Sequence, residues 1–139
     1  MPRSFPDSGV LIDAARAANP ERAKAALYYL DDPKRTYLTS PFVRLETLPK
    51  ADYTGRIQEL TFYEDFFRDP GVEWCRDWNR PETVAEEEAR RHGLGALDAL
   101  HVAAAHLLQA DELVTTERPH KPVHRSRLVH VVYLHADVV

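Results

Sequence analysis

The stretch GLGALDALHVAAAHLLQADELVTTE, residues 93–117, predicts a helix, a tight turn and a buried strand in succession. Gly93 and Gly95 break the chain before the helix, which we expect to end near Gln109. Apolar residues recur at helical spacing in between and should form its buried face: Leu97, Leu100, Ala104, Leu107 and Leu108. The β-prone run Leu113–Thr116 then predicts a short strand.

Two carboxylates flank this helix–strand unit. Asp98 falls in the first helical turn, where the helix N-terminus favours an anion, and Glu117 comes just after the strand. In open parallel α/β sheets, ligands bind beyond the carboxyl ends of the strands. Taken singly, Asp98 is more simply explained as a cap or dipole partner, and Glu117 as a solvated loop residue. A functional interpretation therefore requires further acids with the same placement.

The bulk properties indicate one ordinary globular domain spanning residues 1–139. The net charge of −4 does not predict nucleic-acid binding by bulk electrostatics, so a polyanionic partner would need a local basic patch or a bridging metal ion. The single cysteine, Cys75, excludes an internal disulfide and a thiolate zinc cluster. No apolar run approaches the roughly 20 residues that cross a bilayer, and no signal-peptide pattern is seen, so we expect a cytoplasmic protein.

Strand-like and helix-like segments alternate along the chain. The expected strands are Arg3–Pro6, Arg35–Thr39, Val72–Cys75, Leu113–Thr116 and Leu128–Leu134. The further helices are expected at Val10–Ala18, Glu21–Leu30, Pro41–Leu48, Arg56–Phe67 and from Asn79 to Arg91. Pro49 should interrupt the third of these, Asn79 should cap the last, and the acidic run Glu86–Glu88 should be solvated. This alternation favours a three-layer α/β/α sandwich with a mainly parallel central sheet.

Four acids share a placement that such a sheet would make significant. Asp7 follows the first strand and Glu46 lies in the helix after the second, while Asp98 and Glu117 are placed as described above. If the sheet is parallel, all four can converge at its carboxyl edge, where their mutual repulsion would be strong. Oxygen ligands of this kind suit Mg²⁺ or Mn²⁺, which can activate water for phosphoryl displacement and invert the local charge. Glu46 by itself is a weak indication, because a glutamate in an apolar segment can also snorkel outward.

Several segments resemble the PIN-domain family, which includes the ribonuclease toxins of VapBC toxin–antitoxin pairs. They are DSGVLIDAA (residues 7–15), TSPFVRLETL (39–48), GLGALDALHVAAA (93–105) and ADELVTTE (110–117). The similarity covers most of the chain, is weakest over residues 50–91, and is most specific in LDALHVAAA. The resemblance implies a sandwich fold, cleavage of single-stranded RNA, and an Mg²⁺ or Mn²⁺ site. Its metal-site acids would be Asp7, Glu46, Asp98 and Glu117, with the Ser8 hydroxyl beside the first acid.

The chain departs from the family pattern around these acids. The family often has asparagine where this chain has Gly9, and usually has aspartate where it has Glu117. Two functions therefore remain open. One is a metal-dependent endoribonuclease, expected as a homodimer and as the toxin that a small antitoxin protein would inhibit. The other is a PIN-fold module that binds RNA or protein with weak or no catalysis.

Other residues have both a functional and a structural interpretation. His101, three residues after Asp98, is a candidate general base or hydrogen-bond donor behind the acids, although a packed helix residue is commoner. The tryptophans at positions 74 and 78 could stack on bases, but packing in the core or a dimer is favoured. The segment Arg118–Arg127 is either a solvated loop or a phosphate-binding surface for single-stranded or structured RNA, through Arg118, Lys121 and Arg125.

Overall fold

The computed structural model describes residues 1–77 and 79–136, so the expectation for Trp78 lies outside the described residues. Its strands are β1 (Arg3–Pro6), β2 (Thr36–Thr39), β3 (Glu73–Trp74), β4 (Glu112–Thr115) and β5 (Val131–Tyr133). They form one sheet in the order β3-β2-β1-β4-β5, and every neighbouring pair is parallel. The predicted α/β/α sandwich is confirmed, with a sheet that is parallel throughout.

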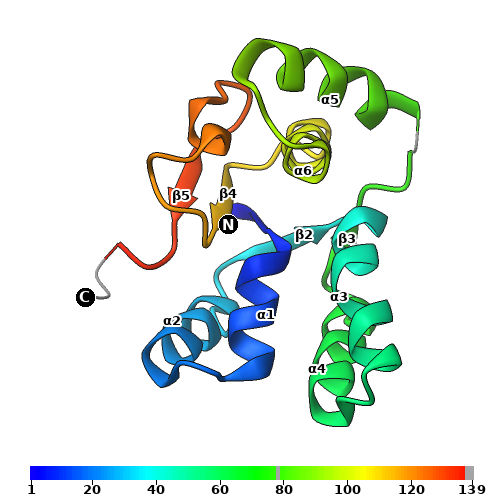
Figure 1. Cartoon of the computed structure of the whole chain (residues 1–139), viewed down its shortest axis with the longest axis vertical. Coiled ribbons are helices and arrows are strands. Elements are labelled where there is room, and N and C mark those ends of the chain that lie inside the picture. Colours follow the sequence, from blue (N-terminus) through cyan, green and yellow to red (C-terminus); the bar gives the residue numbers. More distant parts are fainter. Residues whose placement is uncertain (78, 137–139) are drawn as a thin grey trace.

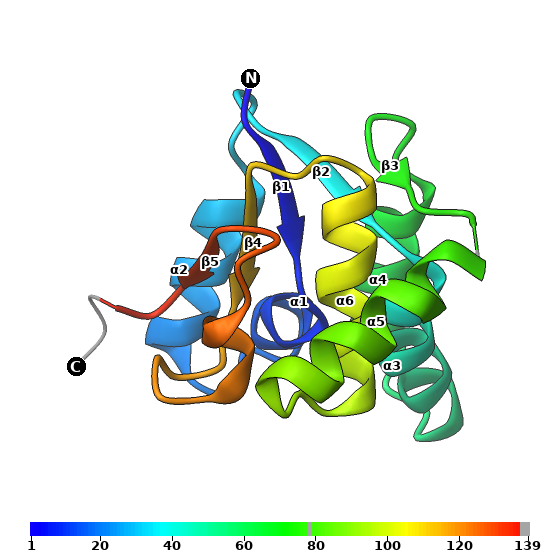
Figure 2. The same cartoon turned by 90° about the horizontal axis from the view of Figure 1, so that it is seen from above.

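The strand order reverses direction between β1 and β4. The chain first moves from β1 to β2 and β3 on one side, then returns to place β4 and β5 on the other. Because crossovers between parallel strands are right-handed, the helices of the two halves should cover opposite faces of the sheet. Figures 1 and 2 show this: α1 (Ser8–Arg16) and α2 (Pro20–Leu30) cover one face, and α5 (Asn79–His92) and α6 (Ala96–Leu107) cover the other. The carboxyl ends of β1 and β4 thus flank the point where such sheets bind ligands.

The helices α3 (Pro41–Tyr53) and α4 (Ile57–Arg68) pack against each other as a hairpin beside α1 (Figure 1). Pro49 was expected to interrupt α3, and this prediction was wrong: the helix continues to Tyr53. Proline removes one helical hydrogen bond. The turn that follows it places Ala51 in the core with only 2% of its surface exposed, and this tertiary packing holds the helix together.

The core lies on both faces of the central strands. Phe5 of β1 and Leu113 of β4 are almost fully buried, with Val10 of α1 and Val102 of α6 equally buried on the helices. The predicted core face of α6 was partly wrong, because Leu97 is 36% exposed. The helix is packed between the sheet and α5, and its small residues make the close approach: Ala99, Ala103, Ala104 and Ala105 are buried.

Two expectations about α5 were also wrong. Asn79 lies inside the helix, and the carboxylate of Asp77 accepts the Asn79 and Arg80 backbone N–H groups at 3.0 and 3.3 Å. Glu88 is not part of a solvated acidic face, since it is 2% exposed and accepts a 2.8 Å hydrogen bond from the Ser126 hydroxyl. Helix α5 therefore holds the segment that follows β4.

Trp74 packs in the structure as the favoured interpretation expected. Its ring lies 5.5 Å from that of Phe67, measured between centroids, and the Arg76 guanidinium lies over the Trp74 ring at 4.9 Å from its centroid. Among the described residues, none of the helices is long and apolar enough to span a bilayer.

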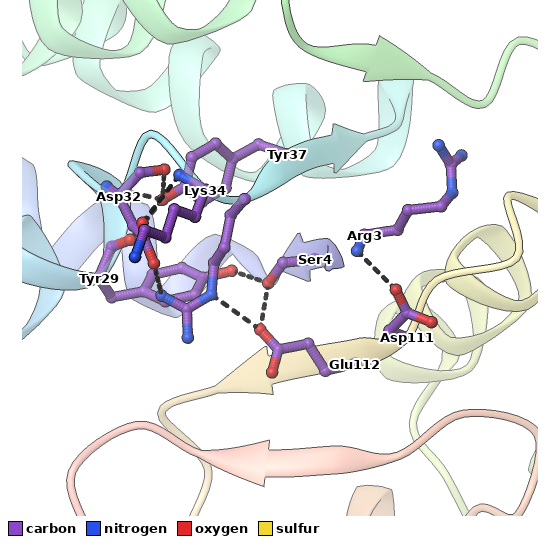
Figure 3. Close-up of polar contacts among 9 residues, drawn as sticks. Arg3, Ser4, Tyr29, Asp32, Lys34, Tyr37, Asp111 and Glu112 are labelled. Carbon is purple, nitrogen blue, oxygen red and sulfur yellow. Dashed lines mark hydrogen bonds and ion pairs between the residues drawn. The ribbon is translucent and has the colours of Figure 1, made fainter. Parts of the chain in front are cut away.

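A polar network ties the amino-terminal ends of the strands together (Figure 3). The Ser4 hydroxyl donates to Glu112 at 2.7 Å and contacts the Tyr29 hydroxyl, while Arg35 binds Glu112 and Asp32 at 3.3 and 2.9 Å. The Arg35 guanidinium is thus paired with two carboxylates, those of Glu112 and Asp32. These bonds join the amino-terminal ends of the strands to one another and to the α2–β2 connection, so we assign this end of the sheet a structural role.

Candidate active site

Asp7 leaves the sheet directly after β1 and caps α1. Its backbone N–H extends the ladder to the Val114 carbonyl at 2.9 Å, and its Oδ1 accepts the Val10 N–H at 3.2 Å. Asp7 is 7% exposed. Burial raises its pKa to about 6, although the Thr115 hydroxyl, His101 and the Val10 N–H oppose the shift, while the charge of Asp98 adds to it.

Thr115, the last residue of β4, links two of the predicted acids. Its buried hydroxyl donates to Asp7 Oδ2 at 2.5 Å and accepts the Glu117 N–H at 3.0 Å. The sequence interpretation used Thr115 only as a β-prone residue and missed this role. The available signal was a hydroxyl at the end of a buried strand, where valine would pack without needing a hydrogen-bond partner.

Glu46 lies in α3, and the two residues predicted to support the acids, Ser8 and His101, both bond to it. The Ser8 hydroxyl donates to Glu46 Oε1 at 2.5 Å, and His101 Nε2 donates to the same oxygen. The Ser8 oxygen and His101 Nε2 are themselves 3.4 Å apart. Burial opposes ionisation of Glu46, yet the hydrogen bonds from His101 and Ser8 outweigh it and hold the Glu46 pKa below its usual value. The structure thus brings Ser8 and His101 against one carboxylate.

Asp98 occupies the first turn of α6, as expected. Gly95 is the N-cap of this helix and makes no side-chain capping bond, and Asp98 itself is half-buried. Burial raises the Asp98 pKa, and the charges of Glu117 and Glu46 raise it further, while His101 lowers it. Since Asp98 in turn raises the pKa of Asp7, the acids at this edge act on one another electrostatically.

The four acids fit a hard divalent cation by their chemistry, but their side chains are not gathered around one point. Among residues 1–77 and 79–136, no three His, Cys, Asp or Glu side chains are arranged to hold a metal ion together. Asp7 is bonded instead to Thr115 and Val10, and Glu46 is bonded to Ser8 and His101. An all-carboxylate set nonetheless suits Mg²⁺ or Mn²⁺ by its chemistry.

The basic segment after β4 is anchored and is not a loose loop. It contains the 3₁₀ turn η1 (Pro122–Arg125), and His124 Nε2 donates to the backbone carbonyl of Glu117 at 2.8 Å. Arg125 donates to the carbonyl of the last residue of α5 at 3.2 Å, whereas Arg118 and Lys121 are exposed. The segment therefore has an anchored backbone next to the fourth acid, with one held cation, Arg125, and two exposed ones.

The protein is therefore a parallel α/β/α sandwich of the class that carries acidic side chains at the carboxyl edge of the sheet. Here these acids follow β1 and β4, on either side of the reversal in strand order. The model of the PIN domain matches residues 4–121, and the chain belongs to the PIN-domain family.

Two solved structures illustrate the likeness. The chain is similar to a chain in the crystal structure of VapBC2 from Rickettsia felis bound to a DNA fragment from the VapBC2 promoter. The two chains are 16% identical with a TM-score of 0.68, and the match covers 93% of this chain and 96% of that one. It is also similar to a chain of a toxin–antitoxin complex from Klebsiella pneumoniae, with 18% identity, a TM-score of 0.68, and coverage of 94% and 97%. No curated protein matches the chain.

Proposed function

We propose that this protein is a metal-dependent endoribonuclease that cleaves single-stranded RNA, and that it is the toxin of a VapBC-type pair. The observation that carries the proposal is the electrostatic coupling of Asp7, Glu46, Asp98 and Glu117 at the carboxyl edge of the sheet. Such a cluster is unfavourable by itself, because like charges in a partly buried site repel. Membership of the PIN-domain family and the likeness to VapBC structures support the same conclusion.

These four carboxylates are the residues that would hold Mg²⁺ or Mn²⁺. When bound, the ion supplies charge neutralisation for the phosphodiester and a more nucleophilic water. The chain itself orients the acids. Thr115 fixes Asp7 and the Glu117 backbone, while hydrogen bonds from His101 and Ser8 favour the ionised form of Glu46 that a cation would bind.

The basic segment is the proposed RNA contact. Arg118 and Lys121 are exposed and follow the fourth acid directly, so phosphates bound there would lead the strand toward the acids. Arg125 is already held by the end of α5 and would present its guanidinium from a fixed position.

Cleavage of a single-stranded RNA by the purified protein tests the proposal. We expect cleavage with Mn²⁺ or Mg²⁺ and none with EDTA. Asp98→Asn should abolish it, whereas Glu87→Gln, at an exposed position on α5, should cleave like the parent. Binding of RNA without cleavage under any metal condition would contradict the enzyme and favour the alternative, a PIN-fold binding module.

The proposed partner is a small antitoxin protein that covers the four acids, and the proposed assembly is a homodimer. Both solved complexes described above contain an antitoxin together with a chain of this fold. Co-purification with the product of an adjacent gene for a small DNA-binding protein, with loss of cleavage in the complex, would support the pairing. Light scattering of the protein alone measures the dimer, and a monomer mass at micromolar concentration would contradict it.

A further inference from the structure

Thr116 lies so close to Gly9 that any side chain at position 9 would force a neighbouring atom to move. A Cβ added to Gly9 would lie 2.1 Å from the Thr116 hydroxyl oxygen and 3.3 Å from the Thr116 Cβ. The same point lies 3.3 Å from Asp7 Oδ1. Since non-bonded carbon and oxygen atoms do not approach to 2.1 Å, the Thr116 side chain fills the space that a side chain at position 9 would need.

The contact lies between the segments that carry Asp7 and Glu117, so it can affect the separation of these two acids. Gly9 lies in the first turn of α1, which Asp7 caps, so it moves with the first acid. Thr116 lies between Thr115, whose hydroxyl holds Asp7, and Glu117. The hydrogen bond from the Glu117 N–H to the Thr115 hydroxyl spans Thr116, so a displacement of the Thr116 backbone would disturb the bond that holds Glu117.

We propose that Gly9 and Thr116 are a matched pair of positioning residues that sets the separation between Asp7 and Glu117. The bare backbone of Gly9 lets Thr116 pack against the start of α1, and this packing brings the fourth acid within reach of the first. The pair thereby tunes the affinity for the divalent cation, an inference that rests on the proposed metal site. Neither residue is assigned a contact with the reacting atoms.

The first experiment measures the pairing without any metal. A Gly→Ala change inside a helix normally stabilises a protein, since alanine has the higher helix propensity. Here we expect the opposite sign: Gly9→Ala should lower the melting temperature in EDTA, and adding Thr116→Ala should recover most of the loss. Gly95→Ala, at the N-cap of α6, is the control for adding a Cβ in open space, because a Cβ there meets nothing within 4 Å; the loss expected from it is only that of a weaker cap. Additive effects of the two changes would overturn the contact.

The second experiment measures Mn²⁺ affinity by calorimetry on the same proteins. Gly9→Ala should weaken binding by about tenfold or more, the size of effect that residues supporting metal ligands produce, and the double variant should recover most of it. Thr116→Ser keeps the hydroxyl and should bind Mn²⁺ like the parent, as should Gly95→Ala. Because the double variant carries the same alanine at position 9, it keeps the comparison usable even where Gly9→Ala alone folds poorly.

The outcomes separate the pairing from the proposed function. Equal Mn²⁺ affinity in the parent and Gly9→Ala, with the coupling in EDTA intact, would reduce the pair to simple packing and overturn its positioning role. A parent that binds no Mn²⁺ would contradict the proposed metal site itself and with it the tuning role. The melts in EDTA distinguish these cases, because they need no metal.

Discussion

Without metal, the buried carboxyl group of Asp7 should stabilise the protein less and less as the pH rises from about 4.5 to about 7.5. The pKa of this group rises from 3.8 to about 6 on folding, with burial as the largest cause. The folded protein therefore holds the proton more tightly than the unfolded chain does. The stabilisation that is fully present below pH 3.8 is lost as the pH rises through about 6.

The size of the effect follows from the pKa shift. One pKa unit corresponds to about 1.4 kcal/mol, so the whole shift amounts to about 3 kcal/mol. At pH 4.5 the carboxyl of the unfolded chain is already mostly ionised, which leaves about 2 kcal/mol to be lost by pH 7.5. The raised pKa of Asp98 acts in the same direction, whereas the lowered pKa values of Glu46 and Glu59 act in the opposite one.

Comparison with Asp7→Asn isolates the contribution of Asp7, since the other groups are common to both proteins. Urea unfolding in EDTA at pH 4.5 and 7.5 should show the parent losing about 2 kcal/mol relative to the variant. The asparagine oxygen can still accept the Thr115 hydroxyl. Asp65→Asn, an exposed change on α4, should keep a constant difference from the parent. A difference between the parent and Asp7→Asn that does not change with pH would refute the argument that burial holds the proton on Asp7.

Three further predictions concern the acids and the basic segment. Asp98→Asn should melt at or above the parent temperature in EDTA, because it removes repulsion, and should lose most of the rise that Mn²⁺ gives the parent; a lower melting temperature together with a parent that ignores Mn²⁺ would contradict this. Thr115→Val should destabilise the protein by about 1–3 kcal/mol in urea unfolding, since the Glu117 N–H loses its acceptor, and an unchanged midpoint would exclude the bridge. Changing Arg118 and Lys121 together to alanine should weaken RNA binding and flatten its salt dependence, with unchanged affinity and slope removing them from the interface.

The secondary structure was predicted correctly where the local sequence pattern agrees with the tertiary packing. The helix–strand unit of α6 and β4 was predicted because two glycines, helical periodicity and a β-prone run follow one another. The extent of α3 was not, because packing of Ala51 in the core outweighs the break that Pro49 suggests. Helical periodicity also placed Leu97 on the buried face, and this was wrong. Periodicity alone does not show how much of a helix its neighbours cover, and they leave Leu97 exposed.

The positions of Asp7 and Glu117 after two adjacent parallel strands were predictable and their contacts were not, while their role as metal ligands stays a prediction. The rule that ligands gather beyond the carboxyl ends of parallel strands placed Asp7 and Glu117 together. No local pattern, however, tells that Thr115 bonds to Asp7 or that Glu88 turns inward to bind Ser126, because each partner comes from a distant segment. Such side-chain pairs are fixed only by the three-dimensional arrangement of the elements.

Hydrogen bonds from the chain itself hold two of the four carboxylates. Thr115 and Val10 bind Asp7, and His101 and Ser8 bind Glu46. In the proposed enzyme, Glu46 would serve a divalent cation only in exchange for some of these bonds, so the Mn²⁺ affinity would include the cost of that exchange as well as the attraction between the ion and the acids. Removing a hydrogen bond to Glu46 would then strengthen Mn²⁺ binding, whereas moving Glu117 away from Asp7 would weaken it. Opposite signs at these two places would distinguish an acid that must exchange partners from an acid that is already in position.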